Sequence, residues 1–134
     1  MTEELKEEIS KIKVWHKQMK EQKELHGDVA VKFDQDKVRM ELLPTRPLKD
    51  IAEVLTIGAK KYEDNNWRQG FDYSRVYGAA QRHLSDWYSG ITFDDETSKN
   101  HLAHAACCIL FLLEYHHSGA GNDDRVKQYD RKEV

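Results

Sequence analysis

Three histidines and three acidic residues are grouped in the second half of the sequence. They are His83, Asp86, Asp94, Glu96, His101 and His104. His83 and Asp86 are three positions apart, and the last two histidines have the same spacing. Side chains at this spacing lie on one face of a helix. Two antiparallel helices joined by the acidic segment would therefore bring the whole group to one end of a bundle.

A group of this composition can bind a divalent metal ion and break a phosphoanhydride bond, because the ion neutralises phosphate charge and acidifies the attacking water. Carboxylates suit Mg²⁺ or Mn²⁺, whereas histidines favour softer ions such as Co²⁺ or Zn²⁺. We expect the catalytic residues, among them a general base toward water, to be His83, Asp86 and Glu96. We expect the metal ligands to be Asp86, Asp94, Glu96, His101 and His104.

A structural interpretation of these histidines also stays open. A single histidine on an apolar helix face is usually a hydrogen-bonded core residue. Three of them beside an acidic segment are harder to satisfy in an apolar core, because each buried nitrogen needs a partner. The group as a whole therefore favours a site. His116 and His117 are not part of it, since adjacent residues on a helix point in different directions.

A second set of residues is suited to binding a nucleotide. The expected substrate-binding residues are Lys37, Arg39, Lys61, Tyr62, Asn66, Trp67, Arg75 and Arg82. The cations can neutralise phosphate, the Asn66 amide can hydrogen-bond a base or sugar, and the Trp67 ring can stack on a base. Arg75 and Arg82 are the stronger phosphate candidates, because they share an expected helix with His83. The alternatives are solvated surface cations, arginines paired with the acidic segment, and a tryptophan that only anchors its loop.

The hydrophobic periodicity predicts that helices position these groups. Apolar residues recur at helical spacing over 2–25, 48–62, 74–90 and 98–118. Thr2 and Ser74 are suited to cap the first and third of these helices, and Gly27 to end the first. The last helix is apolar almost all round over 102–113, which is typical of a central, buried helix. Residues 29–44 alternate instead, which favours a short hairpin or an extended arm.

The chain has room for one modest domain. Its 134 residues are 39% hydrophobic and 34% charged. We divide them into an N-terminal amphipathic helix (1–26), a helical domain (27–118) and a polar, mobile C-terminal tail (119–134). Cys107 and Cys108 are adjacent within an apolar run, where they cannot form an ordinary disulfide with each other. We therefore expect them to be buried, reduced thiols.

The composition argues against several classes of partner. The net charge is −3, without the basic surplus expected of a protein that binds a nucleic-acid polymer. No segment approaches the roughly 20 consecutive apolar residues that a membrane span needs. The N-terminus also lacks the apolar centre of a signal peptide. We therefore expect a cytoplasmic protein that binds neither nucleic acid nor membrane.

A series of short runs matches a known pattern in order and spacing. The runs are LTIGAKKY at 55–62, NW at 66–67, RHL at 82–84, DDET at 94–97 and HLAHAACC at 101–108. Together they resemble the phage dATP/dGTP diphosphohydrolase family, and the segment 34–39 with Leu43-Pro44 is similar to the entry segment of that family. The resemblance spans about 32–115 and leaves out the N-terminal helix and the tail.

This resemblance implies an all-α, MazG-like helical bundle with an extended N-terminal arm and an additional N-terminal helix. It implies a metal-dependent pyrophosphohydrolase that cleaves a purine deoxynucleoside triphosphate between the α and β phosphorus atoms. The expected substrate is dGTP or dATP, with dGTP favoured, and the products are the monophosphate and pyrophosphate. The enzyme would shape the nucleotide pool, as a dimer or tetramer, in the host cytoplasm if a phage encodes it.

The sequence departs from the wider MazG-like superfamily at the expected metal site. That superfamily would place acidic residues on both helices, whereas this chain has His83 with Asp86 and His101 with His104. A position before the acidic segment at which we expect an acid in the family is Ile91 here. The number and identity of the ions therefore stay open, as does whether the histidines ligate metal or orient the attacking water.

Two other functions also stay open. One is a metal-dependent phosphohydrolase that releases phosphate or triphosphate instead of pyrophosphate. The other is a non-enzymatic nucleotide-binding or scaffold protein in which the N-terminal helix makes the important contact.

Overall fold

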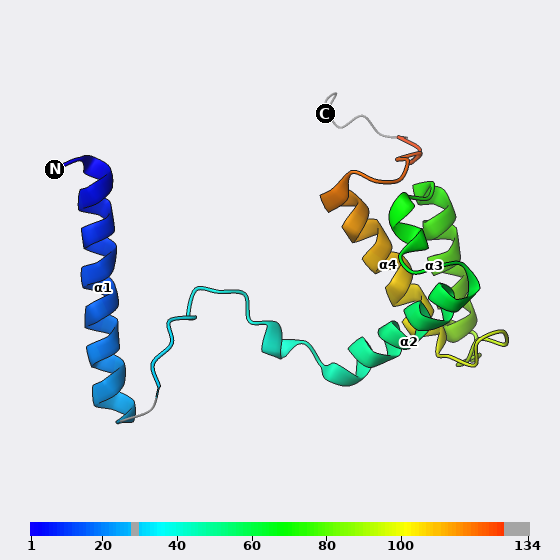
Figure 1. Cartoon of the computed structure of the whole chain (residues 1–134). Coiled ribbons are helices and arrows are strands. Elements are labelled where there is room, and N and C mark those ends of the chain that lie inside the picture. The colour runs from blue at the N-terminus through cyan, green and yellow to red at the C-terminus, as the bar shows by residue number, and fades with distance from the viewer. Residues whose placement is uncertain (28–29, 128–134) are drawn as a thin grey trace, which may run out of the picture. The chain divides into compact units, whose positions relative to one another are not determined.

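The computed structural model describes residues 1–27 and 30–127. Apart from two isolated bridges, all regular structure in this range is helical, as predicted. The α-helices are α1 (Glu3–His26), α2 (Thr45–Lys61), α3 (Tyr73–Tyr88) and α4 (His101–Ser118), with 3₁₀ turns at Met40–Leu42 and Asn66–Gln69 (Figure 1). The chain divides into two compact units, Met1–Met40 and Glu41–Val134, and each is described by itself.

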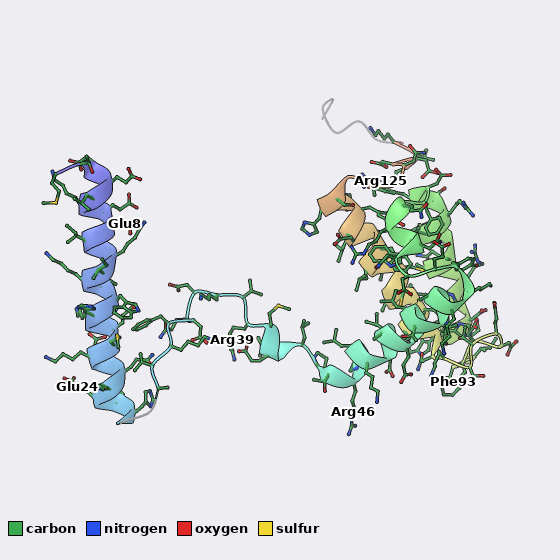
Figure 2. All side chains as sticks on the ribbon, in the orientation of Figure 1. Glu8, Glu24, Arg39, Arg46, Phe93 and Arg125 are labelled. Carbon is green, nitrogen blue, oxygen red and sulfur yellow. The ribbon has the colours of Figure 1, made fainter. Side chains whose placement is uncertain are left out.

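The first unit consists of α1 and the segment that follows it. The Thr2 hydroxyl accepts a hydrogen bond from the backbone N–H of Leu5 at 3.2 Å, which caps the helix. Gly27 ends the helix with a φ of 71°. Both ends therefore agree with the sequence prediction. No residue of α1 is buried, and charged side chains such as Glu8 and Glu24 project from it (Figure 2).

The segment after α1 contains no strand in its described part. Residues 30–39 are extended except for a turn in which the N–H of Lys37 donates to the Asp34 carbonyl at 3.1 Å. The Phe33 ring meets the Trp15 ring edge-on, with 5.9 Å between centroids. Of the two alternatives drawn from the sequence, the described residues therefore have the extended arm and not the hairpin. Two strands this short need further pairing to be stable.

The second unit is built on the antiparallel packing of α3 and α4. The start of α3 meets the end of α4, where the Tyr73 and Tyr115 rings stack with 6.0 Å between centroids. The end of α3 meets the start of α4, where the His83 and His101 rings are 5.1 Å apart. α2 also contacts α4. The buried core of this unit consists of Tyr73, Val76, Ala80, Cys108 and Tyr115.

The helix starts in this unit differ from those predicted. α2 begins at Thr45, three residues before the apolar periodicity, with Pro47 in its first turn, and the residue before α3 is Asp72 and not Ser74. α4 begins only at His101, because Ser98 has a φ of 60°, in the left-handed region. Asn100 caps α4 by accepting a hydrogen bond from the N–H two residues on, at 2.8 Å. Apolar periodicity marks the buried face of a helix, and it does not locate the caps.

α4 is the central helix of this unit, as predicted, since α2, α3 and the turn at Asn66–Gln69 all contact it, but in the single chain it is not buried all round. One face of α4 is buried against α2 and α3, but Leu102, Ile109, Leu110 and Leu113 are exposed. The exposed fraction reaches 51% at Ile109 and 59% at Leu113. Two neighbouring helices can cover only part of the circumference of a third. The apolar residues on the opposite face therefore stay in contact with solvent in the chain taken alone.

The segment after α4 pairs with the residues that lead into α3. The N–H of Tyr73 donates to the Asn122 carbonyl at 2.9 Å, and the N–H of Asn122 donates to the Phe71 carbonyl at 3.2 Å. The two backbones approach closely at a pair of glycines. A Cβ added to Gly70 would lie 2.2 Å from the backbone nitrogen of Gly121, so no larger residue fits there.

Asp124, in the segment after α4, caps the start of α3. Its carboxylate accepts hydrogen bonds from the Ser74 N–H, at 2.8 Å, and from the Ser74 hydroxyl. Asp72, at the usual capping position, makes no such bond with its side chain. The sequence led us to expect a mobile tail from residue 119. In the structure the chain up to Arg125 makes defined contacts, and 128–134 lie outside the described residues.

We predict that Asp124→Ala lowers the melting temperature of the protein by a few degrees, because the first turn of α3 loses its cap. Thermal unfolding followed by circular dichroism would measure the change. Asp123→Ala is the matched control, since Asp123 pairs with Arg125 within the same segment. Equal melting temperatures for the two variants would show that Asp124 does not cap α3.

Candidate metal centre

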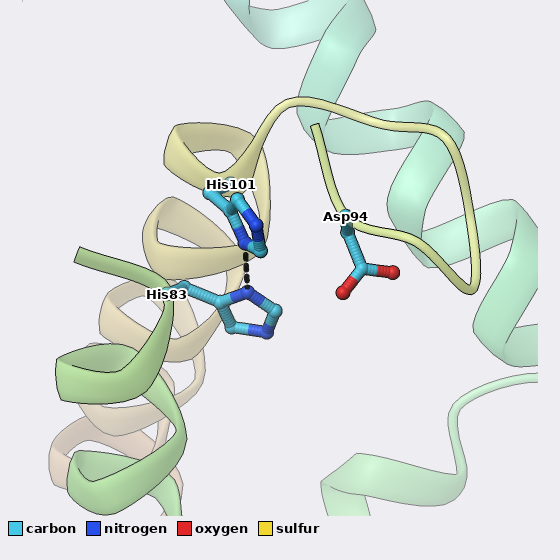
Figure 3. A group of neighbouring side chains, drawn as sticks. All are labelled: His83, Asp94 and His101. Carbon is cyan, nitrogen blue, oxygen red and sulfur yellow. Dashed lines mark hydrogen bonds between the residues drawn. The ribbon is translucent and has the colours of Figure 1, made fainter. Parts of the chain in front are cut away.

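His83, Asp94 and His101 converge where α3 ends and α4 begins. One potential ligand atom of each residue lies within 4.8 Å of the others. His83 comes from the last turns of α3, His101 from the first turn of α4, and Asp94 from the loop that joins them (Figure 3). Antiparallel packing brings the end of α3 next to the start of α4, and the loop 89–100 folds back beside both. Two imidazoles and one carboxylate form a donor set that suits a divalent transition-metal ion.

The two histidines of this group are hydrogen-bonded to each other. His83 Nδ1 and His101 Nδ1 are 2.8 Å apart, so one of them carries a hydrogen and the other accepts it (Figure 3). His101 is buried, with 4% of its surface exposed. Burial, together with the neighbouring rings of His104 and His101, lowers the pKa of His83. A neutral imidazole keeps a nitrogen lone pair, which a metal ligand requires.

His104 lies next to this group without being one of the three convergent residues. Its ring stacks on the His83 ring, with 4.5 Å between centroids and an angle of 10°. Its Nε2 atom is 3.9 Å from Asp94 Oδ2 and 2.7 Å from the hydroxyl of Thr97. Burial lowers the pKa of His104 as well. The two pairs of residues predicted from spacing therefore do meet at one end of the bundle.

The loop that carries Asp94 is held by its own hydrogen bonds. Asp94 Oδ2 accepts from the backbone N–H of Thr97 at 2.9 Å and from its hydroxyl at 3.0 Å. The Asp94 N–H donates to the Lys99 carbonyl, and the His101 N–H donates to the Thr92 carbonyl. Burial raises the pKa of Asp94, but the hydrogen bonds from Thr97 outweigh it, and the pKa is lowered. The carboxylate is therefore ionised at neutral pH.

Glu96 and Asp86 lie further out. Glu96 Oε1 is 2.9 Å from Lys61 Nζ, and the Glu96 side chain is 72% exposed. Asp86 Oδ2 is 3.9 Å from the Nε2 atom of His101, and the Asp86 side chain is 52% exposed. Both therefore border the convergent group. The structure pairs the expected phosphate cation Lys61 with Glu96, a contact that spacing along the chain did not indicate.

The sequence analysis missed two residues that shape the loop. Thr97 hydrogen-bonds Asp94 and His104. An Asp followed three positions later by Thr is a local hydrogen-bonding pattern that could have indicated the first of these bonds. Glu53 on α2 forms an ion pair with Lys99 at 2.8 Å. No sequence signal indicates that pair, because its members are far apart along the chain.

A cavity of about 310 Å³ opens beside the metal centre. Its wall includes His83, Asp94, Glu96 and His104 together with the expected substrate-binding residues Lys61, Tyr62, Asn66 and Trp67. A second cavity, of about 580 Å³, is lined by Arg75 and Arg82. Both cavities are bordered by Tyr62, Asn66, Phe71, Cys108 and Phe111. The predicted phosphate and base contacts of this unit are thus divided between two neighbouring hollows.

Trp67 is part of the packing as well as of the cavity wall. Its ring stacks on Phe111, with 4.4 Å between centroids and an angle of 12°. The guanidinium of Arg68 lies 4.6 Å from the Trp67 ring centre. The buried Tyr115 donates its hydroxyl hydrogen to the Trp67 carbonyl at 2.7 Å. The alternative of an anchoring tryptophan therefore has direct structural support, and any contact with a base is limited to what Phe111 and Arg68 leave uncovered.

Lys37 and Arg39 belong to the arm that follows α1. Arg39 is exposed and lies in the first unit (Figure 2). Their predicted contacts with phosphate involve the second unit, so those contacts stay predictions.

Comparison with known proteins identifies the family. The model for the N-terminal part of the dATP/dGTP diphosphohydrolases matches residues 28–125. The chain belongs to this family. A dATP/dGTP diphosphohydrolase of Salmonella phage PMBT28 is 37% identical over 96 residues, which make up 72% of this chain and 33% of that protein. The chain thus spans well under half of the length of this relative. No solved structure matches this chain.

The match to the diphosphohydrolase family includes the arm, α2, α3, α4 and the capping segment around Asp124. It leaves α1 outside. All residues of the candidate metal centre lie within the matched range. In residues 1–27 and 30–127 we find no helix with the length and apolar character of a membrane span.

The two cysteines provide a test of the packing beside the cavity. Cys107 and Cys108 are buried and unpaired. Burial raises the pKa of Cys107 to about 12 and also raises the pKa of Cys108. We predict that neither thiol reacts readily with a disulfide reagent in the folded protein at about pH 8, because the reactive thiolate is scarce and covered.

The reaction would be followed by the absorbance of the thiolate that the reagent releases, in native buffer and in concentrated guanidinium chloride. Both thiols should react rapidly once the protein is unfolded. Rapid reaction of two thiols in the native protein would mean that α4 is not packed against α2 and α3 as described.

Proposed function

We propose that this protein is a metal-dependent diphosphohydrolase that converts a purine deoxynucleoside triphosphate, preferably dGTP, to the monophosphate and pyrophosphate. The observation that carries the proposal is the convergence of His83, Asp94 and His101 beside a cavity. Its support from comparison is the family match over residues 28–125. The relative from Salmonella phage PMBT28 is named for dATP and dGTP, which is why a purine substrate is proposed.

The proposed metal ligands are His83, Asp94 and His101, with His104 and Asp86 at the border of the group. A bound divalent ion would neutralise phosphate charge and make water a better nucleophile. The residues present fit such an ion, because two imidazoles and one carboxylate supply nitrogen and oxygen donors at short range. This donor set favours Mn²⁺, Co²⁺ or Zn²⁺ over Mg²⁺, which prefers oxygen ligands.

The proposed substrate contacts follow the cavity walls. Arg75 and Arg82 neutralise phosphate in one hollow. Lys61 does so in the other, where a phosphate oxygen must compete with Glu96 for the ammonium group. Tyr62 and Asn66 border both hollows, and they are proposed to contact the base or sugar. Trp67 shapes the wall beside them, and Lys37 and Arg39 are proposed to bind phosphate from the arm.

The proposed general base is a side chain beside the metal ligands. Asp86 and Glu96 are the candidates, because both border the group and are exposed enough to meet water. His83, which the sequence suggests as a catalytic residue, is proposed here as a ligand, and the one lone pair of an imidazole cannot both bind an ion and accept a proton. Water attack at the α phosphorus would release pyrophosphate, and attack at the β or γ phosphorus would release other products.

We further propose that the protein acts as a dimer or tetramer on free nucleotides in the cytoplasm, which is that of the host if a phage encodes it. The exposed apolar face of α4, which includes Leu102, Ile109 and Leu113, supports an assembly that would cover it. The net charge of −3 is consistent with a small anionic substrate held by a few local cations, and not with a nucleic-acid polymer.

The test is hydrolysis of the four common deoxynucleoside triphosphates with Mg²⁺, Mn²⁺, Co²⁺ or Zn²⁺. The products would be separated by ion-exchange chromatography. We predict pyrophosphate and a purine monophosphate for the wild type. His83→Ala and Asp94→Asn should each lower the turnover by about 100-fold or more, because each removes a donor from the metal centre.

His117→Ala is the matched control. His117 is an exposed histidine at the end of α4, outside the convergent group, and its loss should leave turnover unchanged. Inorganic phosphate or triphosphate as the product would contradict the proposed bond cleavage. No turnover of any of these nucleotides with any of the four ions would contradict the enzymatic function itself.

A further inference from the structure

Thr97 lies between the carboxylate of the metal centre and one of its histidines. Its Oγ1 atom is 3.0 Å from Asp94 Oδ2 and 2.7 Å from His104 Nε2. The backbone N–H of Lys99 donates to the same oxygen at 3.2 Å. Asp94 Oδ2 also accepts the backbone N–H of Thr97 at 2.9 Å. One hydroxyl group thus has three hydrogen-bonding partners.

The number of available hydrogens fixes which group donates and which accepts in each hydrogen bond of Thr97. A hydroxyl has one hydrogen and two lone pairs, whereas an ionised carboxylate can only accept. If the Thr97 hydrogen pointed to His104, two oxygens 3.0 Å apart, on Thr97 and Asp94, would face each other with no hydrogen between them. The hydroxyl therefore donates to Asp94. Its two lone pairs accept from the Lys99 N–H and from Nε2 of His104.

We propose that Thr97 is a positioning residue that holds His104 in the tautomer with its hydrogen on Nε2. The lone pair of the ring is then on Nδ1. Every hydrogen and lone pair of the Thr97 hydroxyl is used in this arrangement, and reversing any one bond leaves an unpaired group or an oxygen–oxygen contact. A hydrogen bond made by one nitrogen of a histidine decides in this way which nitrogen is free to accept.

In this tautomer His104 has an acceptor nitrogen close to the metal centre. The His104 ring stacks on His83 and lines the cavity beside the metal centre. An acceptor nitrogen is thereby maintained next to the ligands without a charge on the ring. The assignment of the tautomer depends only on the hydrogen bonds, whereas the role of that nitrogen in turnover rests on the proposed function.

The experiment compares the full-length wild type with Thr97→Val and Thr97→Ser. Valine has nearly the shape of threonine but no hydroxyl, and serine keeps the hydroxyl. Long-range ¹H–¹⁵N correlation spectra at about pH 8 report which imidazole nitrogen carries the hydrogen, and His104→Gln assigns the signal. Thr56→Val is the matched control, because the Thr56 hydroxyl donates to the Ala52 carbonyl within α2, away from the Asp94 loop.

We expect the hydrogen of His104 on Nε2 in the wild type, in Thr97→Ser and in Thr56→Val, and a mixture of both tautomers in Thr97→Val. With a purine deoxynucleoside triphosphate, Thr97→Val should lower kcat by about 10- to 100-fold with little change in KM, and Thr97→Ser should restore it. Thr56→Val should turn over like the wild type.

A wild-type His104 with its hydrogen on Nδ1 would overturn the proposal, whether or not Thr97→Val folds. An unchanged tautomer in a folded Thr97→Val variant would overturn it as well. If the wild type hydrolyses no deoxynucleoside triphosphate, the proposed function fails, but the tautomer spectra still decide whether Thr97 positions His104.

Discussion

α3 and α4 pack side by side in opposite directions, and this contact supplies both the core and the candidate site. At one end the rings of Tyr73 and Tyr115 stack in the most buried part of the unit. At the other end His83 and His101 share a hydrogen bond. Any shift of one helix along the other would disturb the two ends together. The burial of apolar side chains in the core therefore holds the geometry of the polar group.

The polar end of this helix pair is satisfied by hydrogen bonds. The loop after α3 uses the Asp94 carboxylate and the Thr97 hydroxyl to bond its own backbone and His104. Ion pairs to Lys61 and Glu53 fasten the same loop to α2. Among the described residues, no buried side-chain nitrogen or oxygen lacks a partner. The loop can therefore keep an ionised carboxylate and neutral imidazoles close together without an unpaired buried charge.

Histidines in place of acids give the candidate site its particular electrostatics. A cluster of carboxylates repels itself until a cation arrives, whereas His83 and His101 hydrogen-bond each other in the absence of an ion. Only the nearby Asp94 contributes a full negative charge to the convergent group. A polyphosphate would meet less repulsion there than at an all-acidic site, and cations such as Arg75 and Arg82 lie along the neighbouring hollow.

Much of the fold and part of the site could be predicted from the sequence. Helical periodicity indicated α1, α2, α3 and α4, and three-residue spacing placed His83 with Asp86 and His101 with His104, because both features are local properties of a helix. The short runs of matching residues also pointed to the correct family. Spacing along the chain predicts these features because they do not depend on which helices pack together.

Only the tertiary structure decided which of these residues meet. It placed Asp94 with the histidines, paired Glu96 with Lys61, packed Trp67 on Phe111 and left one face of α4 exposed. It also brought Asp124 to the start of α3. Each of these contacts joins segments that are distant along the chain. Their distances depend on how the helices pack and how the loops turn, which one-dimensional spacing does not specify.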